Sequence, residues 1–316
     1  MKKYFISISF IVLILLTSLF LYMLLKSDIS MQPVDKKVYP EVGIEGFLSH
    51  PPVALVSYAD GDEVFYRNQN ALNFSSLNKG FDHIFSYRRS HIDYDFYHKN
   101  KHILTQKRGA GYWLWKPYFI LKTMQLMPEG SVIIYADSGV VFTGSIKPIL
   151  DLLQENDMVL SGHGTPAPLR NHLKMEARKI LSIENDEKIL NSQNIWAFFI
   201  ALRNNKSNRE LVRKWLSLCE NADLLTDSPL DPSIQEKGLA HQHDQSLLSV
   251  VIAQHPEKKL VLKRYILRTK YNVDNFHRHQ EQGYTSPLMN IYGVNKKLAE
   301  ILMNNQVFNK LREIIQ

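Results

Sequence analysis

Short apolar runs that end at polar turns alternate with helix-length segments through most of this 316-residue chain. The first run, Val53–Tyr58, stops before Asp60-Gly61-Asp62, and the most strand-like run, residues 131–136, stops at Asp137-Ser138-Gly139. Strands that are separated by helix-length segments usually pair in parallel, with the helices covering both faces of the sheet. The sequence therefore predicts an α/β fold with a mostly parallel sheet. Strands are expected at 53–58, 81–87, 131–136, 158–161, 195–202 and 260–267, and helices at 63–77, 118–127, 207–219 and 244–253, with a helix or irregular turn at 94–105.

The N-terminus carries a second strong signal, because no charged residue occurs between Tyr4 and Leu25. A helix of that length spans the roughly 30 Å hydrocarbon core of a bilayer, whereas a cleaved signal peptide has a shorter apolar stretch. We expect one N-terminal transmembrane helix within residues 1–26, inserted as a type II signal-anchor that contacts lipid through residues 4–25. Lysines flank both ends, so the compartment of the following domain is left open.

The rest of the chain divides into a linker and one large domain. Residues 27–52 contain four prolines and no sustained period, which is typical of a stalk. Residues 53–316 are long enough for a single α/β domain. One cysteine excludes an internal disulfide and thiolate-rich metal centres. The net charge of +7 is interleaved with 31 acidic residues, which argues against a nucleic-acid partner.

Asp137 is the first candidate for chemistry. Ligands of open parallel sheets bind beyond the carboxyl ends of strands, and a carboxylate placed there can bind Mg²⁺ or Mn²⁺. The same triplet is also typical of a turn in which aspartate caps the next segment. Both readings stay open from these residues alone.

The segment 107–117 gathers cations, glycines and aromatic rings before a predicted helix. Glycine permits close backbone approach to a phosphate, cations neutralise it, and aromatic faces stack on a base or a sugar. Arg108, Tyr112, Trp115 and Lys116 are the candidates for binding a donor, together with Tyr58 at the end of the first predicted strand. The alternative is that the tryptophans anchor the next helix in the core.

Two further clusters contain histidine. His241-Gln242-His243-Asp244-Gln245-Ser246 precedes an apolar helical run, and Asp244 there suits either a metal site or a helix cap. His277 and His279 lie among basic residues after the last predicted strand, where a metal ligand, a phosphate clamp and a solvated surface are all open.

Taken together, the segment 107–117, the strand ending at Asp137 and the run His243-Asp244-Gln245-Ser246 resemble nucleotide-diphospho-sugar glycosyltransferases of the GT-A fold. The pattern is more distantly similar to glycogenin and the bacterial lipopolysaccharide galactosyltransferases. The resemblance implies that Asp137 binds a divalent cation, Mn²⁺ or Mg²⁺, with His277 or His279 as a further ligand. Gly139 departs from the pattern, because it stands where the second metal-binding aspartate is expected.

The same resemblance implies roles for the other candidates. Arg108 and Lys116 would contact the donor, Gln245 would lie near its sugar, and Asp244 would be catalytic beside Asp137. The expected activity is sugar transfer from a nucleoside-diphosphate sugar to a glycan, lipid or protein acceptor, with the leaving diphosphate stabilised by a metal, by Lys and Arg, or by both. The alternative is a membrane-tethered module that binds carbohydrate or anions without catalysis.

Overall fold

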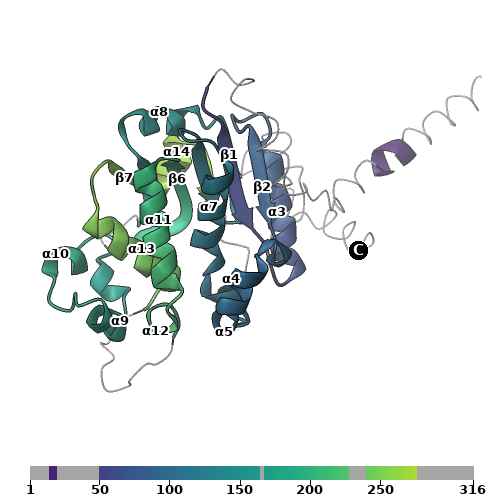
Figure 1. The fold of residues 1–316 in the computed structure, drawn as a ribbon. Coiled ribbons are helices and arrows are strands. Elements are labelled where there is room, and N and C mark those ends of the chain that lie inside the picture. The colour runs from purple at the N-terminus through teal and green to yellow at the C-terminus, as the bar shows by residue number, and fades with distance from the viewer. Residues whose placement is uncertain (1–13, 20–49, 164–166, 228–239, 276–316) are drawn as a thin grey trace, which may run out of the picture.

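A computed structural model describes residues 14–19, 50–163, 167–227 and 240–275. A six-stranded sheet in the order β2-β1-β3-β6-β5-β7 forms its centre (Figure 1). The strands are β1 (Val53–Tyr58), β2 (His83–Tyr87), β3 (Val132–Ala136), β5 (Met158–Gly162), β6 (Ile195–Arg203) and β7 (Lys259–Lys263).

Strand directions place the chemistry at one edge. β1 pairs in parallel with β2 and β3, and β5 with β7, whereas β6 runs antiparallel to both β3 and β5. The predicted α/β fold with a mostly parallel sheet is therefore confirmed. Because β6 is reversed, its first residues lie at the edge where the other strands end.

Helices cover both faces of the sheet, as predicted. On one face lie α7 (Trp115–Leu126), α11 (Lys206–Cys219) and α13 (His243–Gln254), and on the other α8 (Lys147–Glu155) and α14 (Arg264–Lys270), with α3 (Glu63–Ser76) beside β1 and β2 (Figure 1). Alternate residues of β1 enter the two cores: Val56 packs with the first set of helices and Leu55 with the second. A strand buried on both faces is apolar throughout, which is why these strands read as continuous apolar runs.

Asn204 joins two of these layers. Its side-chain amide is fully buried and donates to the carbonyl oxygens of Met124, Met127 and Pro128, at 2.9, 3.0 and 2.9 Å. The carbonyls of Met124 and Met127 lie where α7 ends, and that of Pro128 also accepts from the backbone N–H and the hydroxyl of Ser131. The next residue, Asn205, caps α11 by accepting from the backbone N–H of Asn208 at 2.8 Å. The side chains of two adjacent asparagines thus fix both the end of α7 and the start of α11.

A separate two-stranded sheet lies after Asp137. β4 (Val140–Phe142) pairs antiparallel with β8 (Val273–Asn275), and Val140 faces Asn275 in the register. The sequence analysis contains no prediction of this pair. It ties the turn that carries Asp137 to a segment near the end of the described chain.

The predicted strand at 260–267 is wrong in its second half. β7 stops at Lys263, which pairs with Gly162, the last residue of β5, and the chain then forms α14. β7 ends where its only described partner strand ends. The segment 94–105 forms α4 (Tyr94–Lys99) and α5 (Lys101–Leu104). The remaining described helices are η2 (Arg89–His91), α6 (Gly109–Tyr112), η3 (Leu169–Asn171), α9 (Met175–Ile180), α10 (Glu187–Leu190) and α12 (Ala222–Leu225).

The predicted anchor lies mostly outside the described residues, as does the predicted stalk. Residues 14–19 are described and helical, and Ile14, Leu15, Leu16 and Leu19 are each about half exposed. Within the described part of the chain, no helix has the length and apolar character needed to cross a bilayer.

Candidate active site

A buried ammonium group joins two of the predicted site residues. Lys116 Nζ, in the first turn of α7, lies 3.3 Å from Asp137 Oδ1 and 3.3 Å from Asp244 Oδ2. It also donates to the carbonyl oxygen of Ala197 at the start of β6, at 3.1 Å. Asp137 follows β3 directly and Asp244 lies in the first turn of α13. Helices α7 and α13 and strands β3 and β6 therefore meet at this one cluster.

Exposure differs sharply within the cluster. The side chains of Lys116 and Asp244 are 4% and 5% exposed, whereas that of Asp137 is 26% exposed. Asp137 Oδ1 is held by Lys116 and by the hydroxyl of Tyr135, which donates at 2.5 Å. Asp137 is thus the member that can reach a ligand, and Lys116 and Asp244 lie behind it.

The electrostatics of the cluster follow from its burial. Burial by itself would lower the pKa of Lys116, but the carboxylates of Asp137 and Asp244 outweigh it and raise that pKa. Burial raises the pKa of Asp244 to about 6, although Lys116 opposes the change. Burial also raises the pKa of the Tyr135 phenol, with Asp137 adding to the effect. Lys116 is therefore a permanent internal cation, and it offsets charge on two carboxylates.

The basic segment before α7 has an unusual backbone. Gly109, Ala110, Gly111, Tyr112 and Trp113 all have positive φ, between 50° and 101°. A non-glycine residue held in this region costs on the order of 1–3 kcal/mol, and such residues concentrate at functional sites. Gly111 is needed for a second reason, because a Cβ there would lie 2.8 Å from the Cα of Leu104.

This left-handed segment presents polar groups toward α12 and α13. Arg108, the residue before it, has a 56% exposed side chain that pairs with Asp227 at 3.0 Å. The hydroxyl of Tyr112 donates to the same carboxylate at 3.0 Å. Both residues are among the predicted donor-binding candidates, but no local pattern indicates Asp227, because the partners lie far apart in the chain.

Two aromatic candidates lie inside the core instead. The rings of Tyr58 and Trp115 stack with their centroids 4.1 Å apart, and the residues are 4% and 6% exposed. The indole of Trp115 donates to Gly109 O at 3.0 Å, so it holds the left-handed segment. The alternative reading of the tryptophans as core anchors describes Trp115 correctly. In this geometry neither Tyr58 nor Trp115 offers an exposed ring face to a ligand.

A second ion pair lies at the same sheet edge. Asp60, two residues after β1, accepts from Arg89 Nε at 2.7 Å and from the Tyr58 hydroxyl at 3.1 Å. Arg89 itself follows β2 by two residues. The sequence analysis selects neither residue, although the strand-end rule that selects Asp137 applies equally to both.

Gln245 lies beside the buried cluster. Its side-chain oxygen accepts from the backbone N–H of Ala197 at 3.2 Å, and its amide donates to Gln242. Ala197 is the residue whose carbonyl accepts from Lys116. Gln245 and Lys116 thus bond to the N–H and the carbonyl oxygen of the same residue, Ala197, near the start of β6.

Of the predicted ligands of a divalent cation, only Asp137 lies among the described residues. Asp137 Oδ2 has no protein partner in the described structure, so Asp137 fits that role. Gly139 offers no side-chain ligand, and His277 and His279 lie outside the described residues. No group of three histidine, cysteine or acidic side chains that could hold a metal occurs in the ranges described.

Comparisons with known proteins found a family and several solved structures. A family model of the galactosyl transferase GMA12/MNN10 family matches residues 53–308. Among solved structures, mouse xyloside xylosyltransferase 1 in its apo form is 11% identical with a TM-score of 0.41, over 70% of this chain and 90% of that one. The galactosyltransferase LgtC in complex with donor and acceptor sugar analogs is 12% identical with a TM-score of 0.38, over 83% and 95%.

A comparison with curated proteins gives no match. The family match covers most of the chain and contains every described residue of the cluster around Lys116. It confirms the expected glycosyltransferase. The chain belongs to the galactosyl transferase GMA12/MNN10 family.

Proposed function

We propose that this glycosyltransferase moves a sugar, with galactose as the first candidate, from a nucleoside-diphosphate sugar to a glycan, lipid or protein acceptor. The family supports galactose as the sugar to test first. The observation that carries the proposal is the Lys116 cluster, in which a buried cation holds Asp137 at the ligand-binding edge of the sheet.

Sugar transfer requires the protein to stabilise charge on both the sugar and the leaving group. Positive charge develops on the sugar as the bond to the diphosphate breaks, and negative charge grows on the leaving group. Asp137 lies where it can orient the donor, with one oxygen fixed by Lys116 and Tyr135. The guanidinium of Arg108 is exposed and suits the leaving diphosphate, because a planar fork of donors matches phosphate oxygens.

Asp244 takes a different role from the one first expected. Its side chain is 5% exposed and faces Lys116, so it has no open path to an acceptor hydroxyl in the described geometry. We assign Asp244 to positioning: it fixes Lys116, which fixes Asp137. Lys116 likewise acts on the donor through Asp137.

A divalent cation is part of the proposal. Asp137 Oδ2 would be one ligand, and His277 or His279 a second. β8 ends at Asn275 beside Val140, three residues after Asp137, and His277 follows two residues later in the chain. When bound, such an ion would neutralise part of the leaving diphosphate.

We also propose that residues 4–25 anchor the enzyme in a bilayer as a type II signal-anchor. The uncharged run and the exposed apolar side chains of the helical residues 14–19 support this.

Asp137→Asn provides the central test. It keeps the size of the side chain and removes the charge, so we expect release of nucleoside diphosphate from a panel of sugar nucleotides, UDP-galactose first, to fall at least 100-fold. Asp151→Asn is the matched control, because Asp151 is an exposed carboxylate on α8 that pairs only with Lys147 in the described structure. Wild-type turnover in Asp137→Asn would refute the assignment. Donor binding by the wild-type chain without any release would favour a binding module.

A further inference from the structure

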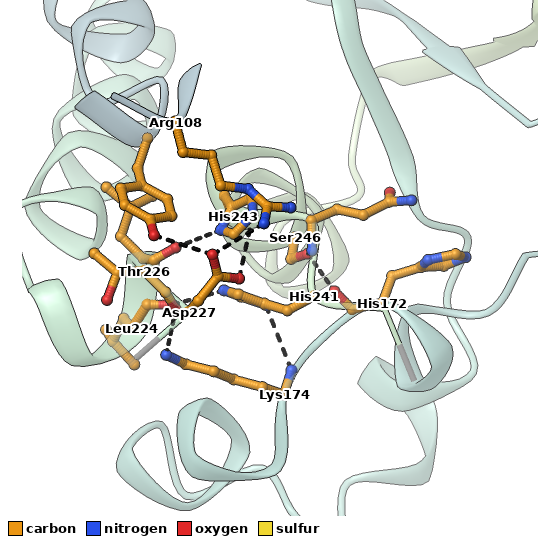
Figure 2. Close-up of polar contacts among 12 residues, drawn as sticks. Arg108, His172, Lys174, Leu224, Thr226, Asp227, His241, His243 and Ser246 are labelled. Atoms are coloured by element: carbon orange, nitrogen blue, oxygen red, sulfur yellow. Dashed lines mark hydrogen bonds and ion pairs between the residues drawn. The ribbon is translucent and has the colours of Figure 1, made fainter. Parts of the chain in front are cut away.

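Two hydrogen-bond donors converge on one carboxylate, that of Asp227 (Figure 2). Arg108 Nη1 and the hydroxyl of Tyr112 each lie 3.0 Å from Asp227 Oδ2. Nε2 of His243 faces the other oxygen, Oδ1, at 3.8 Å. Asp227 comes after α12, whereas Arg108 and Tyr112 precede α7. An acidic side chain from a distant segment therefore fills a site made by other parts of the chain.

The site is shaped by contacts that do not involve Asp227. Tyr112 lies in the left-handed segment, whose backbone N–H groups bond to Lys107, Arg108 and Gly109. His243 is 3% exposed, has a positive φ of 52°, and bonds through Nδ1 to the carbonyl oxygen of Leu225 at 2.8 Å. Its ring lies 5.0 Å from that of Tyr112. The backbone that carries Tyr112 and the ring of His243 are thus held by contacts other than those with Asp227.

Asp227 itself is held only loosely. Its side chain is 38% exposed and that of Arg108 is 56% exposed, so water reaches both partners. Exposed ion pairs are weak, because solvent competes for both charges. Within the described ranges, no other carboxylate pairs with Arg108. A stronger anion can therefore take the place of Asp227 at modest cost.

The residues around Asp227 are close in sequence to those of the Lys116 cluster. His243 directly precedes Asp244, and Trp113 is followed two and three residues later by Trp115 and Lys116. The segments that carry Arg108, Tyr112 and His243 therefore lead into α7 and α13, the two helices that hold Lys116 and Asp244. Phosphate oxygens accept from a guanidinium and a phenol as a carboxylate does, and they carry more charge.

We propose that Arg108 and Tyr112 form an anion site for the diphosphate of the donor, and that Asp227 occupies this site as an internal anion until the donor displaces it. The identity of the donor rests on the proposed function, but the exchange of Asp227 for a diphosphate does not. Removing the charge of Asp227 should therefore raise the affinity for anions, although Asp227 contacts two residues of the binding site.

The test is calorimetric titration of the complete 316-residue chain with inorganic pyrophosphate at low salt. Asp227→Asn should bind pyrophosphate about two- to fivefold more tightly than the wild type. This is the loss of affinity that competition from an exposed ion pair can cause. Asp223→Asn is the matched control. Asp223 is an exposed residue of the nearby α12, and its removal changes net charge equally without touching Arg108 or Tyr112. Arg108→Gln should weaken binding, and adding Asp227→Asn to it should give no further gain.

Four results would overturn the proposal. Weaker binding in Asp227→Asn would make Asp227 an orienting residue. An equal gain in Asp223→Asn, or a gain that persists beside Arg108→Gln, would reduce the effect to net charge. Unchanged binding in Arg108→Gln would remove the site itself. Thermal unfolding midpoints establish that the variants fold, and Asp227→Ser replaces Asp227→Asn if the latter does not. If pyrophosphate behaves as expected but no sugar nucleotide is consumed, only the proposed function fails.

Discussion

Replacing Asp244 with asparagine should change how the stability of the protein depends on pH. Burial raises the pKa of Asp244 from 3.8 to about 6, so the folded chain holds this proton more tightly than the unfolded chain does. The stability that this proton contributes is complete below pH 3.8 and is lost as the pH rises through 6. A difference of about two pH units corresponds to about 3 kcal/mol. Asp244→Asn cannot titrate and does not lose this stability. Between pH 3 and pH 7, its free energy of unfolding should therefore rise by about 3 kcal/mol relative to that of the wild type.

Urea unfolding followed by tryptophan fluorescence measures this difference. Trp215 is a suitable reporter, because its buried indole donates to the backbone carbonyl of Asp244 at 2.8 Å. Asp151→Asn is the control, since that carboxylate is exposed and outside the cluster. Parallel curves for wild type and Asp244→Asn across the whole pH range would refute the account of Asp244 as a buried group that titrates near 6.

Three further predictions use the same structure. Gly111→Ala and Gly130→Ala both place alanine at positive φ, but only the Cβ at residue 111 meets the backbone of Leu104. Urea unfolding should therefore show a cost of about 1 kcal/mol for Gly130→Ala and about 1–3 kcal/mol more for Gly111→Ala. Equal costs would contradict the close contact at Gly111. Asn204→Ala removes a buried donor from the carbonyls of Met124 and Met127, whereas that of Pro128 keeps Ser131 as a donor, so the free energy of unfolding should fall by about 2 kcal/mol in the same urea experiment, and a negligible loss would contradict this account. Chelation of divalent cations should lower sugar-nucleotide turnover, with recovery on adding Mn²⁺; full turnover in chelator would remove the cation from the proposed role of Asp137.

The strands could be predicted where burial leaves a local signal. β1 and β3 are buried on both faces and have matching apolar runs. β4 and β8 have three residues each and are stabilised by pairing with each other across the chain, so neither has a pattern of its own. The false strand after Lys263 has a similar origin, because β7 ends level with Gly162, the last residue of its partner β5, and α14 begins at the next residue.

The site could be predicted in part for a similar reason. Asp137 follows from the rule that ligands gather at the ends of parallel strands. That Lys116 bridges Asp137 and Asp244 depends on how α7 and α13 pack, which no local pattern contains. Aromatic composition cannot tell a ring that binds a ligand from one that supports the core, and Trp115 is the second kind.

The pairing of Val140 with Asn275 also sets an order of events during synthesis. A growing chain can fold its N-terminal elements first, so β1, β2 and β3 can associate while the rest is still being made. The turn that follows Asp137 lacks its partner strand until residue 275 has left the ribosome. The edge of the sheet that carries Asp137 can therefore be completed only late, and a nascent chain that already holds β1, β2 and β3 still lacks this pairing.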